Sequence, residues 1–600
     1  MPFVSPQSQQ RAYDVIVVGS GAAGGQTAYT LSMDGARVLM LEAGRRYTPE
    51  TETPMFQTPD MAPLAGVGTP GKPFGFYDAT VDGGWQVPGE PYVRMTEDHS
   101  GRFEWWRARM LGGRTNHWGR ISLRNGPYDF KPRSRDGLGF DWPIGYEDVA
   151  PYYDKVELLV GVYGTSEGLE NTPGSSPGCL LPPPKPIVSD YLIAQRAKRL
   201  GIPAIPGHRA VLTRPLDHTR NPKLLHPGNA RAQEILAADM RARAACLWAT
   251  PCGRGCAIRA NYQSTTVHLP PALATGNLDI TTDAMVYEVT LGKDGRATGV
   301  SFVDRKSGRH EHASARVVVL AASACESARI LLNSRSGQFP DGLANSSGKV
   351  GRYLMDTVGS DVWGQVPLLE SLPPLNEDGA DGHQLYTPWW LYQQQLAGKL
   401  GFARGYHIEF GGGKHMPGFD TGAGLEWLTG GNYGAKFKQD VRRYYGSFVY
   451  FDGRGEMIPN EGSYCEIDPG GLKDKWGIPV LRFHWQWSAH ETRQAAHMQR
   501  TFADIIDAMG GKPHAVQTNG VKAIAPGGSI IHEVGGAIMG ADPKTSVTNQ
   551  WCQTWDVPNL FITDGAVFAS NADKNPTLTI MALAWRASDH ILERLRRKEL

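Results

Sequence analysis

A glycine-rich turn between two short apolar runs lies near the start of the chain. Residues 13–18, "YDVIVV", are apolar and β-branched, which is typical of a buried strand. The stretch "GSGAAGGQTAYTLSMDG" (19–35) predicts a glycine turn that leads into a helix, and "ARVLMLEAG" (36–44) predicts a second strand. This order predicts a β-α-β unit and therefore an α/β fold with a parallel sheet.

The turn carries the pattern G-x-G-x-x-G at Gly19, Gly21 and Gly24. The first glycine permits the tight turn, the second lets the backbone approach a pyrophosphate, and the third lets helix and strand pack closely. Glu42 ends the second strand, 21 residues after Gly21, where an acid binds the ribose hydroxyls of an adenosine. An acid there also disfavours a 2′-phosphate, so the turn predicts a site for FAD or NAD rather than NADP.

Similar glycine-containing stretches recur far along the chain. They are "LGGRTNHWGR" (111–120), "AASACESARIL" (321–331) and "FITDGAVFASNADKNPTLTI" (561–580). A nicotinamide cofactor usually needs one contiguous unit, whereas segments from across the chain suit the longer FAD; unrelated loops are the alternative. Elsewhere the pattern predicts helices at 145–160, 489–510 and 575–598 and a hairpin within 278–304.

Size and charge set further limits. A chain of 600 residues exceeds one ordinary core, so we expect at least two domains. The net charge is +1 without a basic tract, so no nucleic-acid partner is expected, and no apolar run has the length of a membrane span. The start, "MPFVSPQSQQ", has no signal character, which predicts a cytoplasmic location; co-export to the periplasm with a signal-bearing partner is the alternative.

Several of these motifs together resemble one family. The N-terminal β-α-β unit, "GGRTNHWG", "AASACESARILL" and "HEVGGAIMG…NLFITDGAVF…NPTLTI" are similar to the glucose–methanol–choline (GMC) flavoprotein oxidoreductases. "TPCGRGCAIRANYQSTTVHLPPALATGNL" resembles the bacterial branch with glucoside 3-dehydrogenases and catalytic subunits of membrane-linked sugar dehydrogenases. The resemblance implies a Rossmann-like FAD-binding domain and a discontinuous α+β substrate-binding domain built on an antiparallel sheet.

The resemblance also implies how the chain divides. The FAD-binding domain is expected from 1–125, 265–350 and 525–600, and the substrate-binding domain from 126–264 and 351–524, with a cysteine-containing loop at 246–256. The aromatic segment "HQLYTPWWLYQQQ" (383–395) is expected to border the substrate pocket, with core packing as the alternative.

A histidine and an asparagine are the catalytic candidates. By motif match these are His532 in "IIHEVGGAIMG" and Asn575 in "NADKNPTLTI". Oxidation of an alcohol removes a hydroxyl proton and a hydride from the same carbon atom, and a neutral imidazole suits the proton. The hydride goes to the flavin, and the carboxamide binds and orients the same oxygen. Asn575 precedes Pro576, so a helix N-cap is a second role for it.

The resemblance implies which residues hold the flavin. Gly112, Gly113, Thr115, Asn116 and Gly119 line it, Asp564, Gly565 and Thr577 approach it from the C-terminal part, and the backbone of Val286 contacts the adenine. His117 stands where related pyranose oxidases attach FAD covalently. Relatives with free FAD also have this His-Trp pair, so both forms of attachment remain open.

Three cysteines predict a site for a second cofactor. Cys246, Cys252 and Cys256 are spaced C-x5-C-x3-C, which resembles an iron–sulfur site in membrane-linked FAD glucose dehydrogenase subunits. Such a cluster would pass electrons to a cytochrome c, beside a small signal-bearing subunit. The doubled first cysteine of that group is missing here, and free thiols or a Cys252–Cys256 pair are the alternatives.

Taken with the resemblance, these residues predict an FAD-dependent dehydrogenase that oxidises a secondary hydroxyl of a sugar or glucoside to a 3-keto sugar. His532 is the base and Asn575 binds the oxygen. An oxidase that passes electrons to oxygen, a non-redox lyase that keeps FAD, and a non-catalytic flavin-binding subunit are the alternatives.

Overall fold

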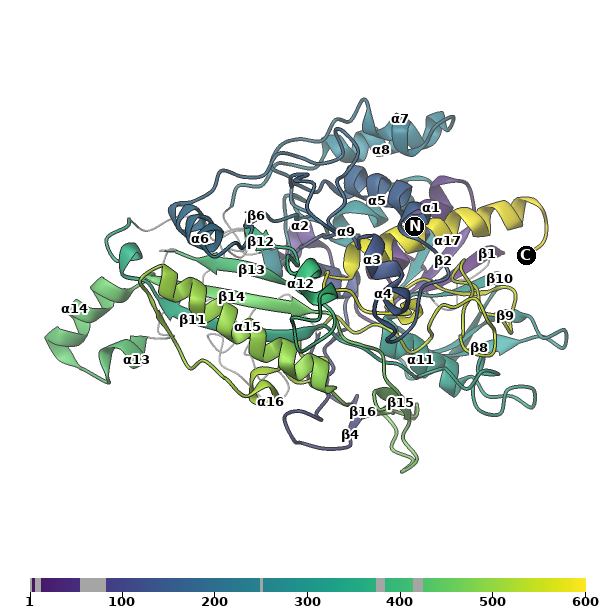
Figure 1. Cartoon of the computed structure of the whole chain (residues 1–600). Coiled ribbons are helices and arrows are strands. Elements are labelled where there is room, and N and C mark those ends of the chain that lie inside the picture. The colour runs from purple at the N-terminus through teal and green to yellow at the C-terminus, as the bar shows by residue number, and fades with distance from the viewer. Residues whose placement is uncertain (1–2, 6–11, 54–82, 249–251, 374–383, 414–424) are drawn as a thin grey trace.

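Two β-sheets organise the chain. The computed structural model describes residues 3–5, 12–53, 83–248, 252–373, 384–413 and 425–600. A seven-stranded sheet lies near both chain ends, and a six-stranded sheet lies beside it with the long helix α15 (Ala489–Ala508) across one face (Figure 1). The candidate site forms where the two sheets approach each other.

The seven-stranded sheet has a parallel centre, as the α/β prediction requires. Its strand order is β7-β2-β1-β10-β9-β8, with β18 beside β10. The parallel strands are β1 (Tyr13–Val18), β2 (Val38–Leu41), β7 (Leu278–Thr281), β10 (His310–Leu320) and β18 (Leu560–Ile562). The predicted hairpin is β8 (Ala284–Leu291) with β9 (Ala297–Asp304), and β9 pairs antiparallel with the start of β10.

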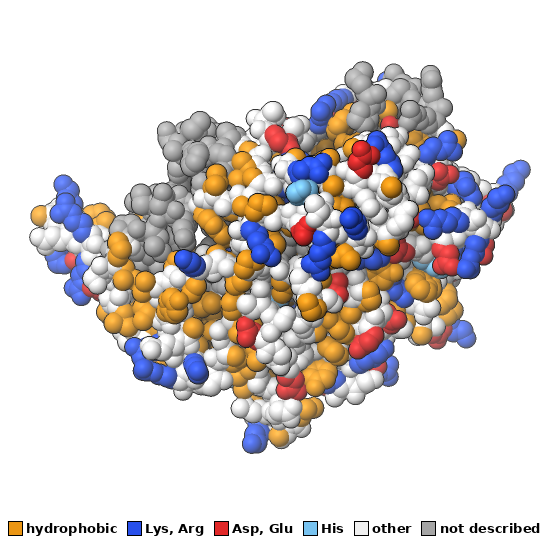
Figure 2. Space-filling model, turned by 90° about the horizontal axis from the view of Figure 1, so that it is seen from above, with side chains coloured by type: hydrophobic (Ala, Val, Ile, Leu, Met, Phe, Trp, Pro, Cys, Tyr) orange, Lys and Arg blue, Asp and Glu red, His pale blue; other side chains and the backbone are white. Residues whose placement is uncertain are grey.

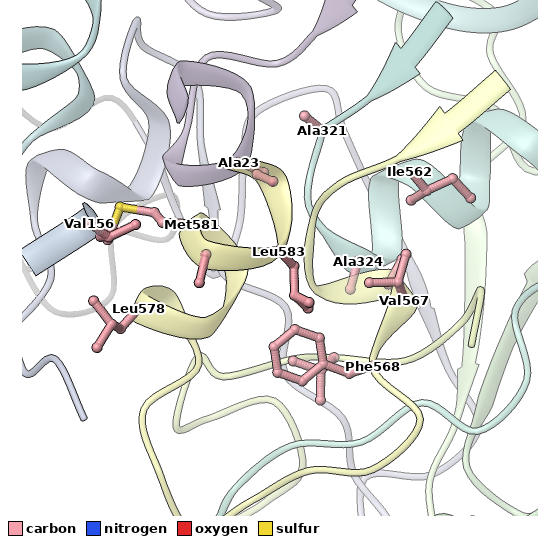
Figure 3. Close-up of a cluster of buried hydrophobic side chains, with 14 of the residues drawn as sticks. Ala23, Val156, Ala321, Ala324, Ile562, Val567, Phe568, Leu578, Met581 and Leu583 are labelled. Atoms are coloured by element: carbon pink, nitrogen blue, oxygen red, sulfur yellow. The ribbon is translucent and has the colours of Figure 1, made fainter. Parts of the chain in front are cut away.

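Buried helices cover this sheet. α1 (Ala22–Met33) follows the glycine turn and packs against α17 (Thr577–Arg596), which in turn packs against α5 (Tyr146–Val160). Figure 3 shows Met581 of α17 beside Val156 of α5, with Ala23 of α1 over the same helix. A fourth helix, α11 (Ala324–Asn333), follows β10 after a short turn, as the repeated strand–turn–helix pattern predicts.

The six-stranded sheet is antiparallel, with the order β17-β11-β14-β13-β12-β6. Its strands are β6 (Ile205–Pro206), β11 (Val358–Gln365), β12 (Leu385–Thr387), β13 (Tyr406–Gly412), β14 (Phe448–Gly455) and β17 (Lys512–Pro513). Alternate residues of a strand face opposite sides. Tyr406 turns toward α15, where its hydroxyl bonds Thr501 Oγ1 at 3.1 Å, so His407 and Glu409 face the other way.

The strands fall in the expected segments of the chain. Those of the seven-stranded sheet lie within 1–125, 265–350 and 525–600, and those of the six-stranded sheet lie within 126–264 and 351–524. The fold class is confirmed, whereas the domain boundaries stay a prediction. The remaining helices of five residues or more are α4 (Pro132–Asp136), α6 (Val188–Arg199), α7 (Asn221–Leu225), α8 (Ala230–Arg241), α10 (Leu269–Ala274), α12 (Tyr392–Leu396), α13 (Leu425–Thr429) and α14 (Gly434–Tyr444).

The surface seen from above mixes charges of both signs. Figure 2 shows Lys and Arg side chains interspersed with Asp and Glu over this face. Within the described ranges, the search for a helix long and apolar enough to cross a lipid bilayer finds none.

Candidate active site

One cavity of about 500 Å³ is lined by residues of both sheets. This volume lies within the range of small-molecule and cofactor sites. Most of the residues predicted from the sequence line it: Gly19, Gly21, Glu42, Gly113, Thr115, His117, Gly119, Val286, His532, Asp564, Gly565, Asn575 and Thr577. The two ends of the chain therefore meet at one cavity, as the resemblance implies.

Three of the residues predicted to hold FAD are not part of the cavity wall. An added Cβ at Gly24 would lie 2.0 Å from the carbonyl oxygen of Gly19, so this glycine permits the close packing of helix and turn. Gly112 has φ +92° and stands against the amide of Asn116. The Asn116 amide accepts a hydrogen bond from Gln263 Nε2 at 3.1 Å and donates one to Leu111 O at 2.9 Å. Gly112 and Asn116 therefore shape the 112–119 loop from behind.

The glycine turn leaves room at the start of α1. Gly19 has φ +99° and passes so close to β10 that a Cβ would lie 2.4 Å from Ala321 O. Gly21 is the N-cap residue of α1, and a Cβ added there would meet no described atom within 4 Å. The N-terminus of a twelve-residue helix thus opens on the cavity across a bare backbone. Such an arrangement suits a phosphate group.

Glu42 is tied to the turn by hydrogen bonds. Its carboxylate accepts from the Ser20 hydroxyl at 2.5 Å, from the Ser20 backbone N–H at 3.0 Å and from the Gly44 N–H at 2.7 Å. The Ser20 hydroxyl oxygen accepts in turn from the Gly112 N–H at 2.8 Å. Burial raises the pKa of Glu42, and these hydrogen bonds oppose that shift. The acid thus joins the first turn to the 112–119 loop while it borders the cavity.

His532 is held by two residues that directly precede β11. Its backbone N–H donates to Asp356 Oδ1 at 2.9 Å, and its ring Nδ1 lies 3.0 Å from Thr357 Oγ1. Its Nε2 lies 3.4 Å from the amide nitrogen of Asn575, which can only donate. Nε2 is therefore the acceptor, and the proton of the neutral ring sits on Nδ1 and points at Thr357. This tautomer leaves the basic nitrogen beside Asn575.

Asn575 is oriented by a carboxylate. Its Nδ2 donates to Glu409 Oε1 at 3.3 Å, which fixes the nitrogen on that side because a carboxylate only accepts. Its Oδ1 is buried without a hydrogen-bond partner among the described residues. The N-cap position of α17 belongs to Pro576, with no side-chain cap, so the N-cap role weighed for Asn575 is wrong. Its side chain is committed to the cavity wall instead.

The surroundings keep the imidazole of His532 neutral. Burial lowers the pKa of His532 to about 3, and the Arg454 guanidinium on β14 adds to this lowering, whereas Glu409 opposes it. Asp356 is affected in the reverse sense: burial and the nearby Glu533 raise its pKa to about 7. Near neutral pH the ring is thus a base that has not yet taken a proton.

The two ring nitrogens of His117, where the sequence leaves a covalent link to FAD open, have different surroundings. Trp106 Nε1 donates to His117 Nε2 at 2.8 Å, so the ring proton of the neutral form is on Nδ1. That nitrogen is buried without a hydrogen-bond partner in the described part of the chain. Burial lowers the pKa of His117 to about 3. A covalent link at this residue stays a prediction.

The C-terminal part of the cavity wall is held by Asp564. Its Oδ2 accepts from the Ser327 hydroxyl at 2.5 Å and from the Ser323 N–H at 3.0 Å, and its Oδ1 accepts from the Ala566 N–H at 2.9 Å. Burial raises its pKa to about 6. Asp564 therefore joins the turn before α11 to the turn after β18.

Cys246, Cys252 and Cys256 form no disulfide bond with any residue that the structure describes. Burial raises the pKa of Cys246 to about 12. Among the described residues, sets of three ligand atoms within 4.8 Å of one another occur at Asp154, Glu157 and Cys179 and at Asp129, Glu456 and Asp573, and the three cysteines form no such set. The iron–sulfur cluster therefore gains no support from this arrangement and stays a prediction.

Several residues that build the site were not predicted. Glu409 and Arg454 line the cavity from the six-stranded sheet, and Asp356, Thr357 and Ser20 hold the predicted residues in place. The segment expected to border the substrate lies elsewhere. Within 384–395, no described residue lines this cavity, and Trp389 is buried with its ring centroid 4.9 Å from that of Tyr406. Residues 384–389 are buried, whereas Gln393 and Gln394 are exposed.

Together these features fit a long cofactor with a phosphate-bearing part. The bare Gly21 backbone gives room beside a helix N-terminus, and Glu42 and Val286 line the cavity on the side of β2 and β8. Buried polar atoms of wall residues, at His117, Glu533 and Asn575, have no hydrogen-bond partner among the described residues. These observations fit FAD, whose flavin ring His532 and Asn575 would border.

Comparisons with known proteins match the chain to one family of oxidoreductases. Models of the N- and C-terminal parts of the GMC oxidoreductases match residues 13–358 and 459–584. The chain is 31% identical to 2-methyl-1,2-propanediol dehydrogenase of Mycolicibacterium austroafricanum, over 97% of this chain and 95% of that one. It is 27% identical to the fructose dehydrogenase large subunit of Gluconobacter japonicus, over 97% and 98%.

Two more similarities bear on activity and fold. The chain is 27% identical to paromamine 6'-oxidase of Streptomyces fradiae, over 97% of this chain and 92% of that one. The crystal structure of pyridoxine 4-oxidase from Mesorbium loti matches with a TM-score of 0.59 at 15% identity, over 96% of this chain and 99% of that one. The second similarity bears on the fold alone.

Proposed function

The chain belongs to the GMC oxidoreductase family, whose members bind FAD, and on this premise we propose that it is an FAD-dependent dehydrogenase of a sugar, glycoside or related polyol. Curated relatives named for a diol, for fructose and for gluconate support this substrate class. The finer proposal is that a secondary ring hydroxyl becomes a ketone, and relatives named C-glycoside 3-oxidase favour it.

One observation carries the proposal. His532 Nε2 and the Asn575 amide nitrogen, 43 residues apart in the chain, lie 3.4 Å apart in the wall of the cavity that the glycine turn opens. A histidine whose free nitrogen meets an amide N–H at one point offers an acceptor and a donor to a single oxygen atom. An alcohol oxygen needs both, because it gives up a proton while negative charge develops on it.

The chain's own residues then have separate tasks. The N-terminus of α1 and Gly21 would hold the pyrophosphate of FAD, and Glu42 and Val286 its adenosine. FAD supplies the hydride acceptor. A substrate oxygen that enters between His532 and Asn575 replaces their 3.4 Å contact, accepts the Asn575 N–H and gives its proton to Nε2. Thr357 holds the opposite ring nitrogen and so keeps Nε2 unprotonated before the reaction.

The rate of flavin reduction should depend little on pH between 8 and 5. His532 must be neutral to accept the proton, and its pKa is lowered to about 3, so protonation removes the base only well below pH 5. The measurement is anaerobic stopped-flow reduction at saturating substrate across this range. Burial raises the pKa of Asp356, which accepts the His532 backbone N–H, to about 7, so Asp356→Asn serves as the control. A decline at pH 6 to 7 that tracks one protonation and persists in this variant would contradict the assignment of His532.

Asn575→Ala should slow flavin reduction by about 10²-fold, the usual cost of one lost donor to a developing oxyanion. The substitution removes an amide N–H but leaves His532 and its bond to Thr357. Stopped-flow reduction measures the effect, and Asn549→Ala, at a half-buried turn of the same C-terminal region outside the cavity wall, is the control. Reduction at the parent rate would remove Asn575 from the reaction.

Anaerobic titration with a substrate panel tests the function itself. The panel contains glucosides, fructose, gluconate and 2-methyl-1,2-propanediol, and bleaching of the flavin absorbance reports the reaction. Mass spectrometry and NMR identify the product and show whether a ring carbon became a ketone. If no member of the panel bleaches the flavin, the proposed substrate class fails, and a non-redox lyase becomes the better explanation.

The electron acceptor is proposed from the relatives. The relatives described above include dehydrogenases as well as oxidases, and one relative is named a large subunit, which favours transfer to a partner protein. We propose a small signal-bearing subunit and a cytochrome c as partners, with co-export as the route to the periplasm and a cluster at Cys246, Cys252 and Cys256 as a further carrier. Hydrogen peroxide released in step with turnover would favour an oxidase instead.

A further inference from the structure

A histidine and a glutamate share one face of the strand β13. His407 and Glu409 are two residues apart, and both are buried. In the antiparallel ladder His407 lies opposite Arg454 of β14, and Glu409 lies opposite Asp452. Glu409 lines the 500 Å³ cavity, whereas His407 lines a separate small space on its other side. The pair therefore forms a wall between the two.

The partner of one ring nitrogen fixes where that ring carries a proton. His407 Nδ1 makes a short hydrogen bond to the backbone carbonyl oxygen of Asp573. A carbonyl oxygen has no hydrogen to give, so Nδ1 must be the donor. In a neutral imidazole the other nitrogen, Nε2, then carries no hydrogen. That nitrogen lies 3.0 Å from Glu409 Oε1.

A bare Nε2 and a carboxylate oxygen cannot form this contact, because both are acceptors. One proton must lie between them. It belongs either to an imidazolium facing a carboxylate or to a carboxylic acid facing a neutral ring, and in both cases the pair is neutral overall. A buried site accepts such a neutral pair far more readily than a lone charge.

The pair also holds the part of the chain that carries Asn575. His407 binds the carbonyl of Asp573, two residues before Asn575, and Glu409 binds the Asn575 amide itself. We propose that His407 and Glu409 share one proton and act as a positioning pair, which fixes the Asn575 amide and sets the charge beside His532. This inference rests on the proposed function, in which His532 and Asn575 receive the alcohol oxygen.

The groups around the pair are charged, so the location of its proton matters. The titratable and charged side chains that face it are Tyr386 of β12, Asp452 and Arg454 of β14, Asp573 and Lys574 before α17, and His532. On its far side Arg124 and His208 line the small space with His407. Lys574 is itself paired, at 2.5 Å from Asp573 and 3.1 Å from Asp129.

The two members of the pair act on His532 with opposite signs. The carboxylate of Glu409 favours a protonated His532, whereas a charged His407 disfavours it. His407→Gln leaves the carboxylate without its shared proton and should raise the pKa of His532. Glu409→Gln removes the negative charge and should not raise it. A purely structural role would not separate the two variants in this way.

The first test needs no substrate. Proton NMR of the FAD-loaded protein should show a far-downfield resonance from the shared proton. It should vanish in His407→Gln and in Glu409→Gln, and it should persist in His532→Ala. A spectrum that neither substitution alters would overturn the shared proton, whether or not the protein oxidises a sugar.

The second test is the pH profile of flavin reduction. In His407→Gln the acid limb should move up by about one pH unit or more, as expected when a nearby carboxylate loses its counter-charge. In Glu409→Gln it should not move up. Ile408→Val, between them on the opposite face of β13, should keep the parent profile. Equal pH profiles in His407→Gln and Glu409→Gln would overturn the electrostatic role. If no substrate reduces the flavin while the NMR resonance behaves as expected, the proposed function fails and the shared proton stands.

Discussion

Replacing His532 with Ala is expected to leave a folded, yellow protein whose flavin is reduced by substrate 10²- to 10⁴-fold more slowly, the usual contribution of a positioned general base. The expectation follows from the one free nitrogen of the ring, which lies beside Asn575 while the other is held by Thr357. Anaerobic stopped-flow spectroscopy at saturating substrate measures the rate, and the bound FAD is quantified by its absorbance.

His312→Ala is the matched control for this experiment. It removes an exposed histidine of β10, which bonds Thr290 Oγ1 at 3.0 Å on the outer surface. This variant should reduce its flavin at the parent rate. If His532→Ala also reduces at that rate with full FAD content, the proton acceptor lies elsewhere.

The second large effect concerns the cofactor itself. Gly21→Leu should yield a folded protein that purifies without colour and does not take up added FAD. Gly21 has φ −67° and ψ −155°, an extended backbone outside the left-handed region that favours glycine, and a Cβ there meets no described atom within 4 Å. The new side chain would therefore leave the fold intact and occupy the space beside the helix N-terminus. Absorbance at purification and FAD titration measure the loss.

Gly24→Ala separates exclusion of the cofactor from damage to the fold. A Cβ at Gly24 would lie 2.0 Å from Gly19 O, so the turn or helix α1 must shift and thermal stability should fall. Gly21→Leu should instead keep the melting temperature of the cofactor-free parent. Full FAD content in Gly21→Leu would show that the cofactor does not pass this backbone.

The predictable part of the fold has local causes. The apolar run 13–18, the glycines after it and the acid at Glu42 each act on near neighbours in sequence, so the β-α-β unit follows from spacing. The small turn before α11 follows in the same way. The antiparallel sheet was expected only through the resemblance, because its strands β11, β13 and β14 pair over long separations and carry no motif.

The candidate site likewise has a part that local sequence predicts and a part that depends on distant contacts. Sequence motifs predicted His532 and Asn575. Nothing in "YHIEFGG" (406–412) indicates that Glu409 contacts Asn575, because the two residues are 166 apart in the chain. The N-cap role weighed for Asn575 failed because Pro576 holds the N-cap position and Asn575 Oδ1, the atom that would accept from a helix N–H, accepts from none of the described residues. The aromatic segment at 384–395 misled for a related reason: composition does not distinguish a core ring such as Trp389 from a substrate-facing one.

The stretch 573–577 is anchored at both ends to different sheets. Its first carbonyl is bound by β13, and its last residue begins α17, which packs on α1. A shift of the six-stranded sheet relative to the seven-stranded sheet therefore moves the peptide that carries Asn575. A ligand that separates the two sheets would therefore displace Asn575. It would stop alcohol oxidation without contacting His532 or Asn575.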